Sequence, residues 1–260
     1  MFDPVRRFRP PLLFKTVPQG EAVRLGTASQ TTLGPHLRVV CWNFFKAIRR
    51  GALGDLAAVS AEADLVLLQE AVLHGGRPHA LHLSSGLEWI MAETLAHARQ
   101  GITSGPKTGC RAPASGTLCL RSLDYEPISG TPKALLLTRY PTAAGGVMTV
   151  INVHAMNFVP LAKFARQMAQ LVELLATQPD PVLVGGDFNT WNPARRRLVF
   201  GSMAGAGLAR APVAAPRRWR HLRQQLDHVF SRGLTLVDAR PLAHISSSDH
   251  IPLRIEFTLA

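Results

Sequence analysis

The sequence predicts an α+β (α/β-type) protein in which two mixed β-sheets pack face to face and helices flank them. Three observations lead to this prediction. Apolar runs of strand type and helical patterns are mixed along the whole chain, and three strand patterns follow one another at its C-terminal end. The 260 residues, 47% of them hydrophobic, suffice to bury a sizeable core between such layers.

The N-terminal residues 1–36 differ in character from the rest of the chain. They are rich in Pro, Gly, Thr and Arg and show no clear period, so we expect an extended arm, partly ordered against one domain of residues 37–260. The N-terminus lacks the apolar core of a signal peptide, and no stretch is long enough to span a bilayer. A cytoplasmic protein is therefore the expectation, although a chain trimmed of an N-terminal anchor would read the same.

The elements of the domain follow from local patterns. Short apolar runs predict strands at 37–42, 64–68, 117–120, 133–138, 147–153, 181–184, 226–230, 234–237 and 251–257. Helical patterns predict helices at 52–61, 87–99 and 161–176, of which the last carries an apolar stripe at 3, 4, 7 spacing. Residues 100–115, rich in Gly, Pro and Thr, are predicted to form a mobile loop. The Arg-rich segment after Asp187 is predicted to be a loop and a short helix.

The formal charge of +12 is unevenly distributed. No acidic residue occurs from Phe188 to Leu226. The same stretch carries eight arginines, which are Arg195, Arg196, Arg197, Arg210, Arg217, Arg218, Arg220 and Arg223. Such a local field attracts polyanions such as nucleic acid or anionic lipid headgroups, although part of the arginine bias can simply reflect a GC-rich genome.

Four of the 17 acidic residues follow or interrupt apolar strands: Glu70, Asp187, Asp227 and Asp249. One such acid alone is usually a turn former or helix cap. If the four converge, a divalent cation is the usual means of relieving their repulsion, and Asn43 would add an amide oxygen. Hard oxygen ligands predict Mg²⁺, with Mn²⁺ as the alternative ion. The three cysteines are too few and too irregularly spaced for a zinc or disulfide framework.

Two of the ten histidines, His154 and His250, stand beside strand boundaries in polar company. A histidine near a carboxylate is held in one tautomer and stabilised as the cation, so such a pair can act as a general base or an electrostatic clamp. Asp227 is the candidate to orient His250. A satisfied structural histidine is the alternative for His154.

Six short motifs occur in a fixed order along the chain. They are Trp42-Asn43, Gln69-Glu70, Asn152-Val153-His154, Gly186-Asp187-Phe188-Asn189, Leu226-Asp227-His228-Val229 and Ser248-Asp249-His250. From about residue 37 to its end, the chain therefore resembles the endonuclease/exonuclease/phosphatase superfamily, which includes deoxyribonuclease I, abasic-site endonucleases, neutral sphingomyelinases and inositol polyphosphate 5-phosphatases. The segments at 125–128, 153–158 and 186–191 make it most similar to a bacterial YafD-like branch.

The resemblance implies a four-layer sandwich of two packed sheets with helices outside, and it implies roles by position. The residues that would hold the catalytic Mg²⁺ are Asn43, Glu70 and Asp249. Asp187 and Asn189 would position the attacking water and the phosphate oxygens. The general base is left open between Asp187 and His250, because different members of the family are described with different bases.

The resemblance further implies that Asp227 pairs with His250 and that His154 contacts the scissile phosphate. In the deoxyribonuclease pattern the counterpart of His154 leans on a carboxylate from the segment after the second motif. Here no acid occurs between Glu93 and Asp124. Asp124 or Glu126 replaces that acid, or His154 lacks a carboxylate partner.

The chemistry predicted is Mg²⁺-dependent hydrolysis of phosphodiester bonds, with DNA as the expected substrate and nucleic acid as the expected partner. The candidate substrate-binding residues are Lys133, Asn157, Arg195, Arg217 and Arg218. Lys133 has the alternative of a solvated strand-edge lysine. Trp191 and Trp219 can stack on bases, or serve core or loop packing. The alternatives are a phosphodiesterase or phosphatase for a phospholipid headgroup or small phosphate ester, and a binding protein with a decayed site.

Overall fold

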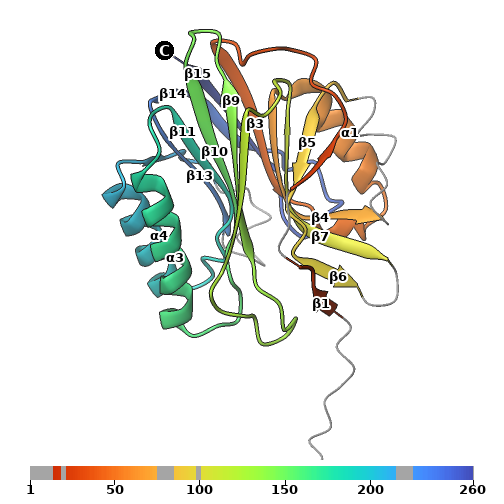
Figure 1. Cartoon of the computed structure of the whole chain (residues 1–260), viewed down its shortest axis with the longest axis vertical. Helices are drawn as coiled ribbons and strands as arrows, with labels where there is room; N and C mark the ends of the chain where they lie inside the picture. Colours follow the sequence, from red (N-terminus) through yellow and green to blue (C-terminus); the bar gives the residue numbers. More distant parts are fainter. Residues whose placement is uncertain (1–13, 19–21, 75–84, 98–100, 215–224, 260) are drawn as a thin grey trace, which may run out of the picture.

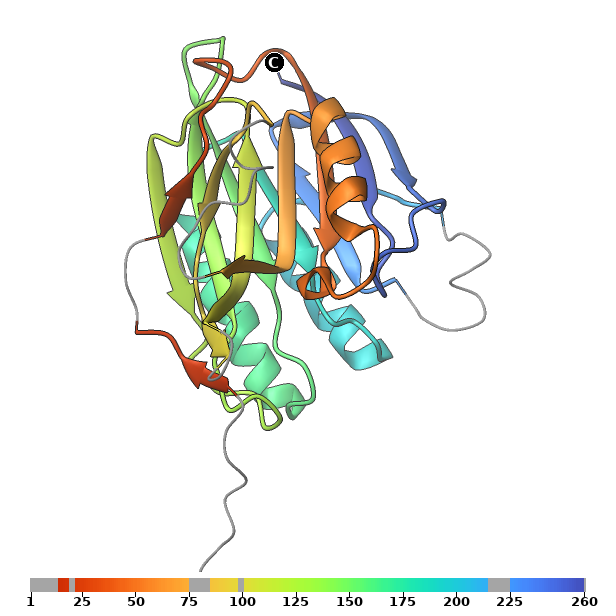
Figure 2. The same ribbon diagram turned by 90° about the vertical axis from the view of Figure 1, so that its right-hand side faces the viewer.

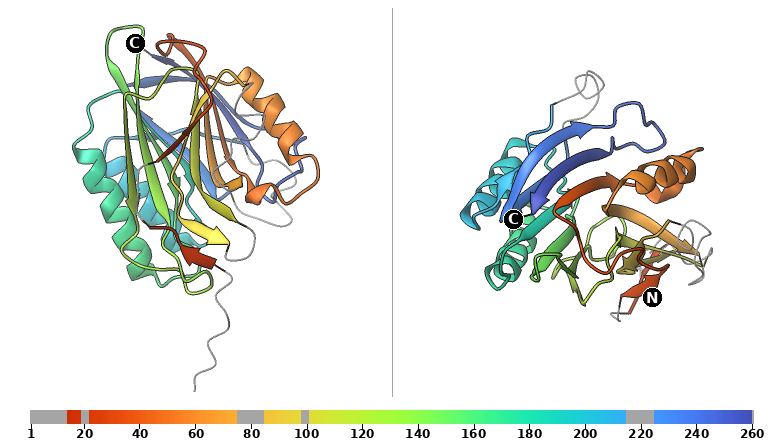
Figure 3. Two further views of the ribbon diagram at one scale, coloured as in Figure 1. Left: turned by 45° about the vertical axis from the view of Figure 1, so that its right-hand side comes forward. Right: turned by 90° about the horizontal axis from the view of Figure 1, so that it is seen from above.

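Two β-sheets packed face to face form the centre of the computed structural model (Figure 1). The structure describes residues 14–18, 22–74, 85–97, 101–214 and 225–259. Helices α3 (Leu161–Ala176) and α4 (Pro193–Gly205) cover one outer face, and α1 (Ala52–Glu62) covers the other, as the view from above also shows (Figure 3). The predicted four-layer sandwich is confirmed.

Among the described residues, the first sheet has nine strands, in the order β1-β6-β7-β4-β3-β15-β14, with β2 and β5 joined beside β7. Its strands are β1 (Phe14–Thr16), β2 (Val23–Leu25), β3 (His36–Asn43), β4 (Leu65–His74), β5 (Glu88–Met91), β6 (Leu95–His97), β7 (Ile102–Cys110), β14 (Leu234–Pro241) and β15 (Leu253–Leu259). Strands β3 and β4 run parallel, whereas β15 pairs antiparallel with β3. The sheet is therefore mixed.

The second sheet has six strands in the part of the chain that the structure describes, in the order β12-β13-β11-β10-β9-β8. They are β8 (Gly116–Arg121), β9 (Ala134–Pro141), β10 (Val147–His154), β11 (Val182–Asp187), β12 (Ala209–Arg210) and β13 (Asp227–Arg232). The parallel pair β10–β11 lies at its centre and is flanked by antiparallel neighbours. Both sheets thus present the carboxyl ends of a central parallel pair, which is where α/β proteins build their sites.

Alternating side chains on the central strands divide the core into three layers. Val39, Cys41 and Leu67 of the first sheet meet residues such as Val150 and Leu183 of the second. The opposite faces of the same strands pack against the helices, with Val153 and Val184 under α3 and α4 and Trp42 and Leu68 under α1. Because these strands are buried on both faces, they read as continuous apolar runs.

Helix α3 has the predicted bounds, because its apolar spacing matches the helical period. Phe164, Met168, Leu171 and Leu175 are buried along one face. Helix α4 is longer than the short helix predicted, with 13 residues. Within the described residues, no helix is both long and apolar enough to cross a bilayer.

The predicted helix at 87–99 is wrong. Its described part, residues 87–97, forms β5 and β6, and Trp89, Ile90 and Met91 are all fully buried. A strand between two packed layers buries consecutive residues on alternate faces, which a helix with one apolar stripe cannot do. Tertiary packing therefore overrides a local helical preference.

The predicted mobile loop at 100–115 is also wrong, because most of it is β7, which pairs with β4, β5 and β6. Its glycines serve close packing. A Cβ on Gly105 would lie 1.8 Å from the backbone oxygen of Ala92. The glycines that indicated a loop are required here because neighbouring strands leave no room for a side chain.

The described part of the predicted N-terminal arm lies along the first sheet. Strand β1 pairs antiparallel with β6, and β2 pairs antiparallel with β5. Figure 2 shows both short strands beside the sheet that α1 covers. Residues 1–13 and 19–21 lie outside the described residues.

Lys107 on β7 gives a first testable prediction, because it is a lysine only 2% exposed, with its ammonium 5.3 Å from the centre of the Trp89 ring. Burial lowers its pKa from 10.5 to about 7. The folded state thus disfavours the proton, and this cost grows as the pH falls from 10.5 towards 7. Lys107→Met should raise the unfolding free energy by about 2 kcal/mol at pH 6 and by much less at pH 10.5. Urea unfolding at both pH values measures this; a loss of stability at pH 6 would contradict it.

Candidate active site

Strand register in the second sheet places three predicted site residues in one row. His154 pairs with Asp187 across β10 and β11, and Asp187 pairs with Asp227 across β11 and β13. The row requires a very close approach of β11 to β10, since a Cβ on Gly186 would lie 1.9 Å from the backbone oxygen of Val153. Only glycine fits there, which explains the glycine before Asp187.

A bulge in the first sheet directs Glu70 towards the same place. The register of β4 with β7 shifts between Leu68 and Ala71, and Glu70 has a left-handed φ of 51°. A bulge of this kind re-aims a side chain that regular alternation would bury. Asn43 ends β3 and pairs in register with Gln69, one residue from Glu70.

A buried amide pair joins the two sheets directly behind the site, and it was not predicted. Gln69 Nε2 donates to Asn152 Oδ1 at 2.7 Å, and Asn152 Nδ2 donates to the carbonyls of Leu68 and Lys107 at 3.0 Å. Both amides are fully buried. These buried hydrogen bonds fix the position of β4 relative to β10, while Gln69 Oε1 has no hydrogen-bond partner among the described residues. The polar residue inside each apolar run is the sequence signal that marks it.

The segment that carries Asp249 and His250 is bound to the end of β3. Ser248 Oγ donates to the backbone oxygen of Asn43 at 2.7 Å, and Trp42 Nε1 donates to the backbone oxygen of His250 at 3.3 Å. The hydroxyl of Ser248 also accepts the backbone N–H of His250. These hydrogen bonds fix residues 248–250, which belong to no helix or strand, next to the end of β3.

These elements meet around one cleft of about 720 Å³. Nine of the predicted site residues line it, namely Asn43, Glu70, Lys133, His154, Asn157, Asp187, Asn189, Asp249 and His250. Asp227 lies beside the cleft, bonded to His250. Residues far apart in the sequence therefore share one site, as their positions at strand ends predict.

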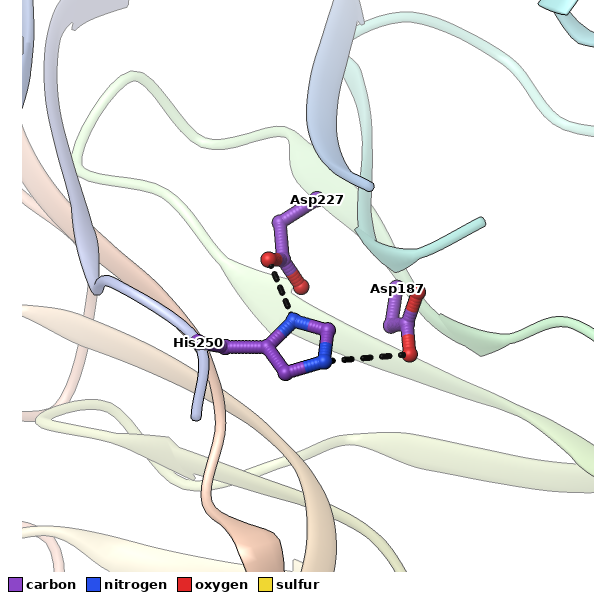
Figure 4. Close-up of side chains that lie close together, drawn as sticks. All are labelled: Asp187, Asp227 and His250. Carbon is purple, nitrogen blue, oxygen red and sulfur yellow. Dashed lines mark hydrogen bonds and ion pairs between the residues drawn. The ribbon is translucent and has the colours of Figure 1, made fainter. Parts of the chain in front are cut away.

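His250 lies between two carboxylates (Figure 4). Its Nδ1 donates to Asp227 Oδ2 at 2.7 Å, and its Nε2 is 4.0 Å from Asp187 Oδ2. Burial alone would lower the pKa of His250, but Asp227 and Asp187 raise it to about 10. The ligand atoms of the three residues lie within 4.8 Å of one another. Because both carboxylates stabilise the protonated ring, the three residues form a carboxylate–imidazolium array.

Asp187 is a buried carboxylate surrounded by hydrogen-bond donors. Burial raises its pKa to about 6; His250 opposes this rise, and Asp227 adds to it. Its oxygens accept the backbone N–H of Asn189 at 2.9 Å and Asn43 Nδ2 at 3.0 Å. Asn189 itself has a left-handed φ of 49°, which asparagine tolerates well. At neutral pH Asp187 is thus an ionised carboxylate with an unusually high affinity for a proton.

His154 faces two carboxylates at similar distance. Its Nε2 is 3.9 Å from Glu70 Oε1 and 3.8 Å from Asp187 Oδ2. Burial, with nearby Lys133 adding to the effect, lowers the pKa of His154 well below its usual range. His154 is therefore neutral at physiological pH, and its ring can still donate one N–H.

Neither acid considered as a partner for His154 fills that place. Asp124 forms ion pairs with Arg166 and Lys163 on α3. Glu126 accepts the backbone N–H of Asn157 at 2.6 Å and lies 3.4 Å from Lys133 Nζ. His154 thus has no dedicated carboxylate from the segment 122–133. That segment is instead anchored to α3 and to the end of β10.

Lys46 is a cleft residue that was not predicted. It lies in a short 3₁₀ turn (Phe45–Ala47) whose three residues all have left-handed φ angles of 47° to 56°. Such strain in non-glycine residues is concentrated at functional sites. The ammonium of Lys46 forms an ion pair with Glu70 Oε2. A basic residue soon after the Trp42-Asn43 motif is the only sequence signal.

Glu70 is ionised across the physiological range. Burial alone would raise its pKa, but His154, Lys46 and Lys133 together lower it to about 2. Because His154 is neutral in this range, the two ammonium groups are the charges that matter. Glu70 therefore presents a permanent negative charge to the cleft.

The prediction of Arg195 as a substrate contact is wrong. Arg195 is only 1% exposed and donates to the backbone oxygens of Met156 at 2.7 Å and Val159 at 3.0 Å. It falls on the buried face of α4 with Val199 and Met203, a spacing of four that was visible in the sequence. Arg217 and Arg218 lie outside the described residues.

Comparisons with known proteins agree with this geometry. The chain matches the Endonuclease/Exonuclease/phosphatase family over residues 41–250. A UPF0294 protein of Yersinia enterocolitica is 33% identical over 239 residues, 92% of this chain and 89% of that protein, which confirms the YafD-like branch. A Beutenbergia cavernae endonuclease/exonuclease/phosphatase structure has a TM-score of 0.63 at 18% identity, covering 87% of this chain and 72% of that one. The structure of the endonuclease domain of TRAS1, a telomere-specific non-LTR retrotransposon, has a TM-score of 0.59 at 18% identity, covering 86% of this chain and 99% of that one. This chain belongs to the Endonuclease/Exonuclease/phosphatase family.

Proposed function

We propose that this protein is a Mg²⁺-dependent phosphodiesterase whose substrate is DNA. Membership of the family makes it a phosphoester hydrolase; the metal and the substrate are the proposal. The observation that carries it is the Asp227–His250–Asp187 array beside the carboxylates of Glu70 and Asp249 in one cleft.

The residues present fit a hard divalent cation. Glu70 and Asp249 supply carboxylate oxygens, and Asn43 supplies an amide oxygen, all in the lining of the cleft. Mg²⁺ prefers such oxygens in small number and keeps several waters. The ion pair between the Lys46 ammonium and Glu70 supports this assignment, because a positive charge already lies beside the carboxylate. When bound, Mg²⁺ would polarise a phosphate oxygen and neutralise charge on the leaving oxygen.

The side chains divide the remaining chemistry between them. Asp187, with its pKa raised to about 6, is suited to accept the proton of the attacking water, and Asn189 and Asn43 hold it in place. The high pKa of His250 makes it a poor base and a good cation for the charge that develops on phosphate oxygens. Neutral His154 donates a hydrogen bond to the same phosphate. We therefore assign the base to Asp187.

DNA is favoured by charge and by the contents of the cleft. The net charge of +12 and the acid-free stretch of residues 188–226 favour a polyanion. Lys133 lines the cleft beside His154, where a backbone phosphate would lie. The endonuclease domain of TRAS1 shows that a chain of this fold can act on a nucleic acid.

An activity panel tests the proposal. Plasmid, abasic duplex, single-stranded DNA, RNA, sphingomyelin and small phosphate esters are incubated with Mg²⁺ and with chelator. We expect DNA cleavage that requires Mg²⁺, together with DNA binding that weakens steeply with salt. Turnover of only lipid or small esters would overturn the DNA assignment, and activity in chelator would overturn the metal.

A phospholipid headgroup is the second candidate, for one reason. Three exposed aliphatic side chains, Leu123, Ile128 and Leu161, lie on the segments around the cleft, and the first two are more than 70% exposed. Exposed apolar groups of this kind can enter a lipid surface. Hydrolysis of lipid vesicles that falls in the Leu123→Ala variant would favour this candidate.

Lys46 provides a prediction about metal binding. Because its ammonium is paired with Glu70, a cation bound at Glu70 must displace it. Lys46→Met should therefore tighten Mg²⁺ binding roughly tenfold, about the effect of one partly screened ion pair. Titration calorimetry measures this, with Lys15→Met, an exposed lysine on β1, as the control. Weaker Mg²⁺ binding in Lys46→Met would contradict it.

A further inference from the structure

Two aromatic rings, Phe158 and Trp191, line the cleft beside the catalytic residues and remain exposed. Their exposed fractions are 62% and 44%, whereas Trp42, Trp89 and Phe188 are fully buried. A large ring left in water forgoes the stabilisation that burial provides. Two such rings in one reaction cleft therefore need a reason beyond packing.

The Trp191 ring is held rigidly from behind. Its Nε1 donates to Asn157 Oδ1 at 3.0 Å, and the Arg195 guanidinium lies 5.0 Å from its centre. Arg195 is itself stacked at 4.2 Å on the buried ring of Phe164 and bonded to carbonyls of the segment 156–159. The arginine that the sequence suggested for substrate thus supports the ring from inside, where its charge is most weakly hydrated.

The Phe158 ring is held at the surface in spite of backbone strain. Phe158 has a left-handed φ of 51°, which is unfavourable for a bulky residue. Its backbone N–H donates to Asn157 Oδ1 at 2.9 Å, the same oxygen that binds Trp191. The backbone N–H of Asn157 is in turn accepted by buried Glu126. One asparagine oxygen therefore binds both the indole of Trp191 and the backbone of Phe158, and strain that persists in this way indicates a functional site.

We propose that Phe158 and Trp191 form a stacking surface for nucleobases next to the scissile phosphate, which selects DNA strands with unpaired bases. The inference rests on the proposed function. Every base has a planar face that stacks on an aromatic ring. In a duplex those faces are covered by neighbouring bases, and exposing them costs free energy. The surface therefore favours single strands, frayed ends and loops over intact duplex.

The decisive experiment separates bases from phosphates. Binding is measured by fluorescence anisotropy, in chelator so that no strand is cut, with three labelled probes. They are a short single-stranded DNA, the same DNA as a duplex, and a single strand with abasic sugars throughout. We expect the base-containing single strand to bind about tenfold more tightly than either other probe, as stacking on one or two rings provides.

Variants assign the difference to the rings. Phe158→Ala and Trp191→Ala should each weaken the binding of the base-containing single strand about tenfold. Neither substitution should change the binding of the abasic strand. Phe158→Tyr should bind the base-containing strand as tightly as the wild type, because it keeps the ring. Tyr125→Ala is the matched control, since Tyr125 carries an aromatic ring, is 54% exposed and does not line the cleft.

The outcomes separate the stacking surface from the proposed function. Equal binding of abasic and base-containing strands, or equal losses on both in Phe158→Ala, overturns the stacking surface. Cleavage of the abasic and the base-containing single strands at equal rates with Mg²⁺ would also overturn the stacking surface, but it would leave the nuclease proposal standing. Base-dependent binding without cleavage of any nucleic acid would overturn the nuclease proposal and keep the surface. Vesicle binding lost in both Phe158→Ala and Leu123→Ala, with no preference for bases, would identify a lipid-docking rim instead.

Discussion

Asp187→Asn should lower kcat about a thousandfold, because it removes the group that accepts the proton of the attacking water. The substitution keeps the volume of the side chain, but its single oxygen can accept only one of the two hydrogen bonds, because Asn43 and Asn189 donate to different oxygens of Asp187. It also removes a carboxylate whose raised pKa shows that burial disfavours its charge. Because the lost hydrogen bond and the removed buried charge act in opposite directions, the unfolding free energy at pH 7 should change by less than about 2 kcal/mol. Steady-state kinetics with Mg²⁺ and urea unfolding measure the two effects together.

A distant carboxylate supplies the control for this variant. Asp180 is half-exposed, forms an ion pair with Arg232, and lies outside the cleft. Asp180→Asn should leave kcat within a factor of about two, since an exposed pair contributes little. Near-normal turnover of a folded Asp187→Asn protein would show that another group accepts the proton. An unstable Asp187→Asn protein would show that the carboxylate is needed for folding.

Elements with one clear environment were predictable from the sequence. The apolar stripe of α3 is sufficient to define its bounds, and the runs ending at Asn43, His154 and Asp187 are buried strands, as expected. The segment 87–115 was not predictable, because its side chains and glycines are selected by the neighbouring layers. Gly105 is needed where β7 approaches Ala92, and no local pattern contains that contact.

The same distinction holds within the site. Asp187 and His154 stand at strand ends, and register alone brings them together. The position of Lys46 depends on three consecutive left-handed residues, which composition does not reveal. Arg195 shows the converse error, because a net positive segment says nothing about which way each side chain points. Charge could be predicted from the sequence, whereas side-chain direction needed the structure.

Asp227→Asn should convert His250 from a permanent cation into a titrating group. Burial lowers the pKa of His250, and Asp227 is the main group that raises it to about 10. Without that carboxylate, burial should lower the pKa of the imidazole in the metal-free protein below pH 8, because only Asp187, at 4.0 Å, and Asp249 still raise it. At pH 8 the phosphate would then lose a cationic donor, and kcat should fall on the order of a hundredfold. Activity should recover in part as the pH falls and His250 regains its proton.

Two measurements with one control decide this prediction. NMR titration of the imidazole follows the charge directly, and wild-type His250 should stay protonated through pH 8. The folded pKa of His250 lies above its unfolded value, so the stability due to its charge is full below about 6.5 and is lost as the pH rises through about 10. The stability difference between wild type and Asp227→Asn should shrink over that window. Asp238→Asn, an exposed acid paired with Arg240 at 3.3 Å, should change neither result. If His250 stays protonated at pH 8 in Asp227→Asn, then Asp187 alone sustains its charge and Asp227 serves only to orient the ring.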